Sequence, residues 1–302
     1  KGSLDLSAST LAPQWFRKRR ALAIMLVGLG GTAGGMLFPK LNAWLIQSFG
    51  WREAYRYLGA GLWLIFVPII FIFLDNKPED IGLLQDNAAQ PDETDDEPVE
   101  GDEVSLTQAQ ALKTPAFWIL TFAIFQASMI GTGIVLHFVS IFEQQGFDMD
   151  YTAGILGIKT FVGFATTMLA GLFMDRVKRQ HWVLAGSMLL TVISYGLLAF
   201  MRDESMVVLY VLISGIAGGL MSLSVGVLKP NLFGRKFLGG VSGVTMAINV
   251  IGSAIGPLVI GAAFDLVGSY QGIILLSALF PLAAGIASLF IKKPTVSEPL
   301  IN

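Results

Sequence analysis

The chain of 302 residues contains no cysteine and only two histidines, His137 and His181. The absence of cysteine excludes disulfides, thiolate metal sites and cysteine nucleophiles. Charged residues are also scarce: they make up 14% of the sequence, whereas soluble domains carry about 25%. Apolar residues reach 54%, and 34 glycines come in addition. This composition excludes disordered, collagen-like and ordinary soluble proteins, and it favours a chain that crosses a membrane several times.

Eight long apolar runs are present, each close to the roughly 20 residues that a membrane-spanning helix needs. An open strand would leave its backbone groups unpaired in lipid, and the runs lack the alternation of a transmembrane barrel. The predicted fold class is therefore an all-α integral membrane bundle. The expected spans are 21–47, 53–74, 116–140, 151–174, 181–200, 205–228, 238–264 and 271–291.

Charge is distributed unevenly along the chain. Residues 75–113 hold 12 of the 22 acidic residues, so the net charge of −2 hides a basic remainder. This acidic stretch indicates a solvated linker, with a docking tail as the alternative. With the spans above, 15 of the 20 Lys and Arg residues fall on one side of the membrane and three on the other. The positive-inside rule then predicts that the first side, which carries both ends of the chain, is cytoplasmic.

Five residue pairs recur 218 positions apart, at helix starts, mid-span glycines and helix exits. The pairs are Arg17/Arg235, Lys18/Lys236, Gly34/Gly252, Pro39/Pro257 and Gly50/Gly268. They favour two homologous bundles joined by the linker, as in transporters with parallel repeats; chance identity between glycine-rich spans is the alternative. The expected domains are the end of an N-terminal bundle (1–74, its last two helices), the acidic cytoplasmic linker (75–115), a C-terminal six-helix bundle (116–291) and a cytoplasmic tail (292–302).

Four passages resemble the major facilitator superfamily, and most closely its branch of oxalate/formate exchangers and monocarboxylate porters. They are Trp15 to Ala23, Phe49 to Tyr55, Pro78 to Leu83 followed by Ala111 to Trp118, and Gly171 to Arg179. The resemblance covers almost the whole chain, from the end of the family's fourth helix to its twelfth. It implies a twelve-helix transporter of which about eight helices are present here, the chain being truncated at its N-terminus.

Two lysines lie inside predicted spans, Lys159 and Lys40. A lysine in the middle of a membrane span costs about 2.5–3.5 kcal/mol on insertion scales, so each of the two is expected to face a cavity or a partner. The resemblance implies that the two helices meet across the domain interface, where two ammonium groups would attract a small carboxylate. Snorkelling of either side chain to the outer membrane surface is the alternative.

Other polar residues within the spans are candidates for substrate binding. His137 could hold or pass a proton, or it could be a structural histidine. Gln126 and Asn249, together with Ser128 and Ser222, could bind substrate through hydrogen bonds or could bridge helices. Apart from Glu53, the first residue of 53–74, no acidic residue lies inside a predicted span, so a coupling carboxylate would have to lie in the missing helices.

The resemblance implies a conformational latch in the cytoplasmic loop after the fourth span, formed by Gly171, Asp175, Arg176 and Arg179. In the superfamily this loop controls the rocking of the two bundles. Basic residues at a membrane end can also be a simple orientation signal.

The seventh span carries a helix-packing pattern. Gly252 and Gly256 form a small-xxx-small face, and Pro257 can kink the helix. The pattern is similar to a glycine/proline motif of superfamily antiporters. The first span keeps Gly34 and Pro39 of this motif. Packing alone is the other interpretation.

Two basic residues that are typical of the branch are absent from this chain. Porters of the branch place an arginine where this chain has Thr167, and oxalate exchangers use a lysine in the helix that corresponds to 238–264, which here has none. Both departures count against oxalate. Lys159 lies two helical turns from Thr167 and is interpreted as a relocated cation.

The sequence thus predicts a secondary transporter in the cell (inner/plasma) membrane that moves a small organic anion, such as a monocarboxylate, by alternating access. Coupling to a proton or a counter-anion would make it a symporter or an antiporter. A drug or metabolite antiporter and a non-transporting sensor on the same scaffold are the alternatives. An enzyme is not expected, since no cluster of ligands or nucleophile with its base is visible. Neither cofactor, metal nor nucleic acid is expected, and the remaining partner is membrane lipid.

Overall fold

The computed structural model describes residues 15–16, 20–69 and 105–294 of the chain. This part is built from helices joined by turns and contains no strand. The all-α fold predicted from the apolar runs is therefore confirmed. Within the helices, the side chains not described are those of 20–21, 25, 29, 31–33, 35–40, 42–43, 149–150 and 153.

Six helical segments of the described part are long and apolar enough to cross a membrane. They coincide with the six spans predicted after residue 115. The segments are α5 (Pro115–Leu136), Gly154–Met174 within α7 (Met149–Met174), α8 (Gln180–Ala199), α9 (Glu204–Phe233), α10 (Leu238–Val267), and Tyr270–Ser288, which joins α11 (Tyr270–Ser277) to α12 (Leu279–Ser288).

Two predicted spans are divided: 271–291 into α11 and α12, and 116–140 into α5 and a further short helix. The run 116–140 was expected to be a single helix, but α5 ends before His137, and the short α6 (Phe138–Gln144) follows it. His137 leaves the helical region at φ −97° and ψ 10°. The imidazole contacts α10 and α11, as described below, so the break follows from tertiary contacts that the apolar pattern does not report.

Side-chain caps mark the beginning of some of the spans, among them α5 and α9. The hydroxyl of Thr114 accepts a hydrogen bond from the backbone N–H of Phe117, and Pro115 occupies the first helical position, where its missing N–H is no loss. Asp203 caps α9 in the same way through the N–H of Met206.

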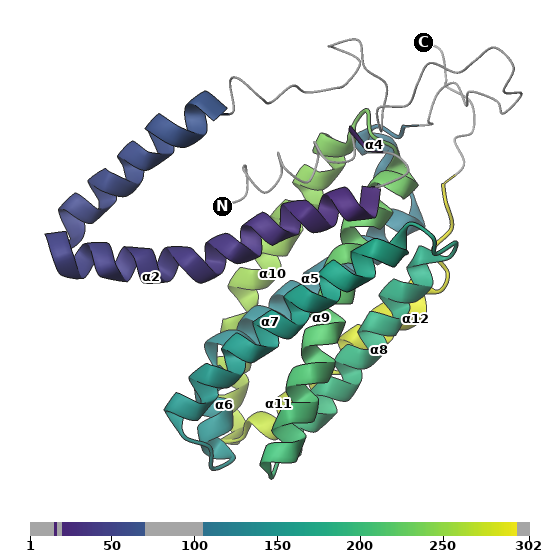
Figure 1. The fold of residues 1–302 in the computed structure, drawn as a ribbon. Coiled ribbons are helices and arrows are strands. Elements are labelled where there is room, and N and C mark those ends of the chain that lie inside the picture. The colour runs from purple at the N-terminus through teal and green to yellow at the C-terminus, as the bar shows by residue number, and fades with distance from the viewer. Residues whose placement is uncertain (1–14, 17–19, 70–104, 295–302) are drawn as a thin grey trace, which may run out of the picture.

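The first two predicted spans lie along α2 (Arg20–Gly61) and the π-helical turn η1 (Leu62–Phe66). Gly50 divides α2, since its φ of 78° and ψ of 161° are not helical. Figure 1 shows the resulting two arms: the first lies against α7 and α9, and the second stands away from the other helices. The end of the second span and most of the acidic linker fall outside the described residues.

The Gly50/Gly268 pair of the sequence repeat shares a backbone feature. Gly268 ends α10 with φ 71°, and Gly50 ends the first arm of α2 with φ 78°. A positive φ suits glycine and terminates a helix. The two glycines share a positive φ but not the same turn, since ψ is 161° at Gly50 and 9° at Gly268.

Helix pairs hold the C-terminal bundle together, chiefly α5 with α10, α8 with α9, α7 with α9, and α8 with α12 (Figure 1). At one end of the bundle, Phe138, Phe142 and Tyr210 belong to a buried cluster. At the other end, Phe117 and Phe233 belong to a second cluster. Many large apolar side chains stay on the outside, as expected where lipid rather than water surrounds the helices.

Candidate functional site

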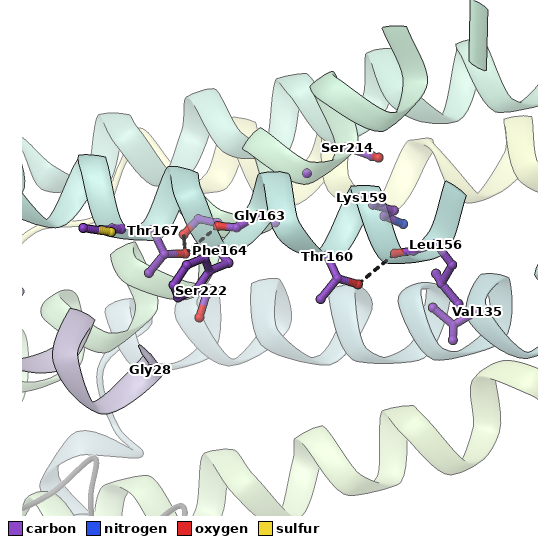
Figure 2. A pocket seen from close by; sticks show the side chains of 14 residues that line it. Gly28, Val135, Leu156, Lys159, Thr160, Gly163, Phe164, Thr167, Ser214 and Ser222 are labelled. Carbon is purple, nitrogen blue, oxygen red and sulfur yellow. Dashed lines mark hydrogen bonds between the residues drawn. The ribbon is translucent and has the colours of Figure 1, made fainter. Parts of the chain in front are cut away.

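A cavity of about 350 Å³ opens between α7 and α9, with α5 and the first arm of α2 at its border. Figure 2 shows Lys159 and Thr160 toward one end of it, and Thr167, Phe164 and Ser222 toward the other, near Gly28 of α2. Its lining residues are Gly28, Val135, Leu156, Lys159, Thr160, Gly163, Phe164, Thr167, Met168, Ser214, Gly215, Gly218, Gly219 and Ser222.

Lys159 is the one charged residue among those that line the cavity. It lies ten residues after the start of α7 and five residues after Gly154, where the membrane-length segment of this helix begins, which is about 7 Å along the helix axis from that point. Its ammonium donates a hydrogen bond to the hydroxyl of the buried Tyr210 at 3.2 Å. The same nitrogen lies 5.3 Å from the centroid of the Tyr210 ring and 5.9 Å from that of Phe138.

The contacts of Lys159 leave its charge uncompensated by any acid. In the part of the chain that the structure describes, no carboxylate lies within salt-bridge distance of this ammonium; the ion pair found there joins Arg56 to Glu53. Aromatic faces and one hydroxyl stabilise a cation only partly. The positive charge of Lys159 is therefore not neutralised inside the apolar bundle, and a bound anion would stabilise it.

Small residues bring α7 and α9 together on the floor of the cavity. A Cβ added to Gly219 would collide with the carbonyl oxygen of Gly163, and one added to Gly215 would lie 3.0 Å from the carbonyl oxygen of Lys159. The hydroxyl of Thr167 donates to the carbonyl oxygens of Gly163 at 2.9 Å and Gly219 at 3.2 Å. Thr167, which stands where the resembling porters have arginine, thus lies in the same cavity as Lys159.

His137 lies at the junction of α5 and α6, outside this cavity lining. Its Nε2 is 3.2 Å from the carbonyl oxygen of Pro257 on α10, and its Nδ1 is 3.2 Å from the hydroxyl of Tyr270 on α11. A carbonyl only accepts, so Nε2 carries a proton and Nδ1 can accept from the tyrosine. An added Cβ on Gly261 would lie 3.5 Å from the ring, an ordinary van der Waals contact, so the ring does not require glycine there.

Asn249 belongs to a polar contact between α5 and α10. The hydroxyl of Ser128 donates to the backbone carbonyl of Asn249 at 2.8 Å and lies 2.6 Å from the hydroxyl of Ser253. The backbone of Asn249 therefore bridges the helices, and its half-buried side chain makes no hydrogen bond within the described residues.

Gln126 lies apart from the other candidates. Its side chain is fully buried. Its amide donates to the carbonyl oxygen of Ala123 at 3.0 Å and approaches the sulfur of Met188 on α8 at 3.2 Å. It thus packs into the α5–α8 contact and does not line the cavity.

The glycine pattern of α10 lies against α5. A Cβ on Gly252 would approach the carbonyl oxygen of Phe125 at 2.8 Å, and one on Gly256 would overlap that of Met129. Pro257 lies within the same helix, next to this contact. Gly34 is half-buried in α2, whereas Lys40 and Pro39 lie in α2 with side chains outside those that the structure describes.

The four latch candidates lie where α7 turns into α8. Gly171 is buried in the last turns of α7, and Asp175 is the C-cap residue of that helix. Arg176 and Arg179 are exposed, and the guanidinium of Arg179 lies 5.9 Å from the centroid of the Trp182 ring. The structure thus gathers these residues at one end of the bundle, away from the cavity lining.

Sequence reasoning missed the aromatic partners of Lys159 and the hydroxyl of Ser214 in the cavity. Phe138 and Tyr210 carry no signal of their own in a chain rich in apolar residues. A signal did exist on α9, where Ser214, Gly218 and Ser222 recur every four residues and so share one helix face. No group of three or more His, Asp or Glu side chains that could hold a metal occurs among the described residues.

Apolar helices around a cavity that contains one lysine define a multi-span membrane protein with room for a small solute. The Major Facilitator Superfamily model matches residues 1–181 and 160–301, which together cover nearly the entire chain. The chain belongs to the Major Facilitator Superfamily. This membership places it among transporters rather than enzymes.

Three curated proteins are similar to the chain. The hexuronate transporter of Escherichia coli is 24% identical over 275 residues, which are 84% of this chain and 61% of that protein. The aspyridones efflux protein apdF of Emericella nidulans is 20% identical over 286 residues, 94% of this chain and 54% of that protein. The uncharacterized transporter YycB of Bacillus subtilis is 23% identical over 172 residues, 55% of this chain and 42% of that protein. The chain thus spans less than two thirds of the length of these relatives.

Proposed function

We propose that the chain forms the substrate-carrying part of a secondary transporter for a small organic anion, most simply a monocarboxylate. The observation that carries the proposal is Lys159, an ammonium within the α7–α9 cavity that no carboxylate of the described residues neutralises. A bound carboxylate would supply the missing charge. At 4 Å and an effective dielectric constant of 20, the attraction is about 4 kcal/mol before the desolvation of both groups is subtracted.

The lining of the cavity supports a monoanion. The hydroxyls of Thr160, Ser214 and Ser222 offer hydrogen bonds, while Val135 and Phe164 give apolar walls. A single lysine in this lining matches a single carboxylate, and the hydroxyls suit a substrate with further polar groups. The hexuronate transporter is named for a sugar acid with one carboxylate, which supports the same class of substrate.

The mechanism we propose is alternating access. The N-terminal and C-terminal bundles would rock about the cavity, with Gly171, Asp175, Arg176 and Arg179 as the latch at the cytoplasmic end and with both chain ends on that side of the plasma membrane. Coupling to a proton would involve His137, the histidine at the α5–α6 break; exchange for a counter-anion would need no titratable group. Membership of the oxalate/formate and monocarboxylate branch is part of the proposal.

A drug or metabolite antiporter is the second candidate, and the similarity to an aspyridones efflux protein favours it. Such a substrate need not be charged. The two candidates therefore differ in what competes for the cavity: carboxylates for the first, uncharged compounds for the second. A sensor on the same scaffold would bind the ligand without moving it.

Uptake into proteoliposomes tests the proposal. The natural protein that carries this chain is reconstituted, and uptake of a labelled short monocarboxylate is measured against unlabelled carboxylates and their amides. We expect competing carboxylates to abolish uptake and the amides, which match them in size, to leave it unchanged. Equal competition by amides would favour the second candidate, and binding without uptake would favour the sensor.

A further inference from the structure

A second cavity, a groove of about 320 Å³, lies between α8 and α12. Figure 1 shows these two helices side by side, whereas α2 lies against α7 and α9. The groove lining is apolar, and it runs from Trp182 and Leu289 at one end past Gly186 and Ile286. The side chains at its rim are exposed, with Trp182 at 53% and Leu289 at 39%. An open apolar groove of this kind needs an occupant.

Two glycines shape this groove. An added Cβ on Gly285 would come within 3.0 Å of Cβ of Met188, so α12 approaches α8 closely there. An added Cβ on Gly186 would meet nothing within 4 Å. The missing side chain of Gly186 therefore leaves open space in the wall, and a larger residue at this position would fill the groove without displacing the helices.

Basic residues lie at the Trp182 end. Gly285 lies against Ala185 and Met188, and Leu289 lines the groove together with Trp182. The two helices are therefore antiparallel. α12 ends at Ser288, so Lys292 and Lys293 follow its end at the side of the bundle where Arg179 precedes α8. All three cations are exposed, and none forms a salt bridge with the described residues.

We propose that the α8–α12 groove binds one acyl chain of an anionic phospholipid, whose phosphate lies among Arg179, Lys292 and Lys293. From Trp182 to Leu189 the groove is about 10 Å long, compared with about 15 Å for the hydrocarbon of one leaflet. Tryptophan favours the depth of the lipid headgroups. Lys and Arg clusters at a membrane surface attract anionic headgroups. Shape, depth and charge thus point to the same ligand.

The fluorescence of Trp182 offers a direct test. The protein is reconstituted into vesicles that contain, at equal mole fraction, either phosphatidylglycerol or phosphatidylcholine with brominated acyl chains, which quench nearby tryptophan. Subtraction of the signal of a Trp182→Phe variant isolates the emission of Trp182. We expect brominated phosphatidylglycerol to quench this emission several-fold more effectively than brominated phosphatidylcholine.

Two variants distinguish the binding of the acyl chain from the binding of the headgroup. Gly186→Leu should reduce quenching by both lipids, whereas Gly196→Leu, at a position on α8 that is equally free of neighbours, should leave it unchanged. Replacing Arg179, Lys292 and Lys293 with glutamine should remove the preference for phosphatidylglycerol. Equal quenching by both lipids in the unchanged protein, or equal behaviour of the two leucine variants, would overturn the proposal. If neither lipid quenches the emission of Trp182 and the protein has the mass of a dimer, the groove binds a second copy of the chain, and the lipid proposal is wrong.

Discussion

Replacing Gly256 with alanine is expected to destabilise the bundle by about 1–3 kcal/mol, which lowers its thermal midpoint by several degrees. The added Cβ would overlap the backbone carbonyl oxygen of Met129. A backbone group cannot rotate away as a side chain can, so α5 and α10 would have to separate. Gly133 and Gly252 tighten the same contact from either side, with added Cβ atoms 2.9 Å and 2.8 Å from the carbonyl oxygens of Gly256 and Phe125.

Gly243 provides the matched control for this prediction. It lies on the same helix, and an added Cβ there would meet nothing within 4 Å. Alanine is the better helix former, so Gly243→Ala should leave the midpoint unchanged or raise it slightly. Thermal unfolding of both variants in detergent, followed by size-exclusion chromatography, gives the comparison. Equal midpoints for the two variants would show that the close approach of α5 and α10 does not determine stability.

Replacing Lys159 with glutamine is expected to weaken the binding of the carboxylate about 10- to 100-fold, the loss of a hydrogen bond to a charged group. The change keeps a polar side chain of similar reach but removes the ammonium beside Tyr210 and Phe138. Arginine at the same position should retain part of the affinity, because it keeps the charge. Binding of an uncharged amide, which gains nothing from the ammonium, should be unaffected.

The readout is the dissociation constant of the carboxylate and its amide for each variant, measured on the purified protein. Lys113→Gln removes the same charge from an exposed site before α5 and should bind like the unchanged protein. Stability should not fall with Lys159→Gln, since the variant no longer buries a charge in the bundle. A glutamine variant with undiminished affinity for the carboxylate would remove Lys159 from the site.

The spans after residue 115 could be predicted because the run length of apolar residues alone determines where a helix can cross a membrane. The break at His137 could not. It depends on Pro257 and Tyr270, which lie 120 and 133 residues further along the chain. The glycines at 252 and 256 were visible as a pattern, but that their partner is α5 followed only from the three-dimensional arrangement.

The candidate site was predictable to a similar degree. The cost of a lysine in a span singled out Lys159, while the residues around it come from other segments and have no distinctive spacing. Gln126 and Ser128 show why polarity alone is insufficient. Residues two apart on a helix are rotated by about 200° about the helix axis and so lie on nearly opposite faces. Ser128 therefore contacts α10, while Gln126 contacts Met188 on α8.

The most direct test of the central proposal, a carboxylate bound in the Lys159 cavity, is protection of an introduced cysteine from alkylation. These 302 residues contain no cysteine, so Ser214→Cys places a label site in the cavity lining, and Ser205→Cys places a control at the exposed start of the same helix. We predict that a monocarboxylate, and not its amide, slows alkylation at position 214 and leaves position 205 unchanged. Alkylation at position 214 that proceeds at the same rate with and without carboxylate would contradict the account.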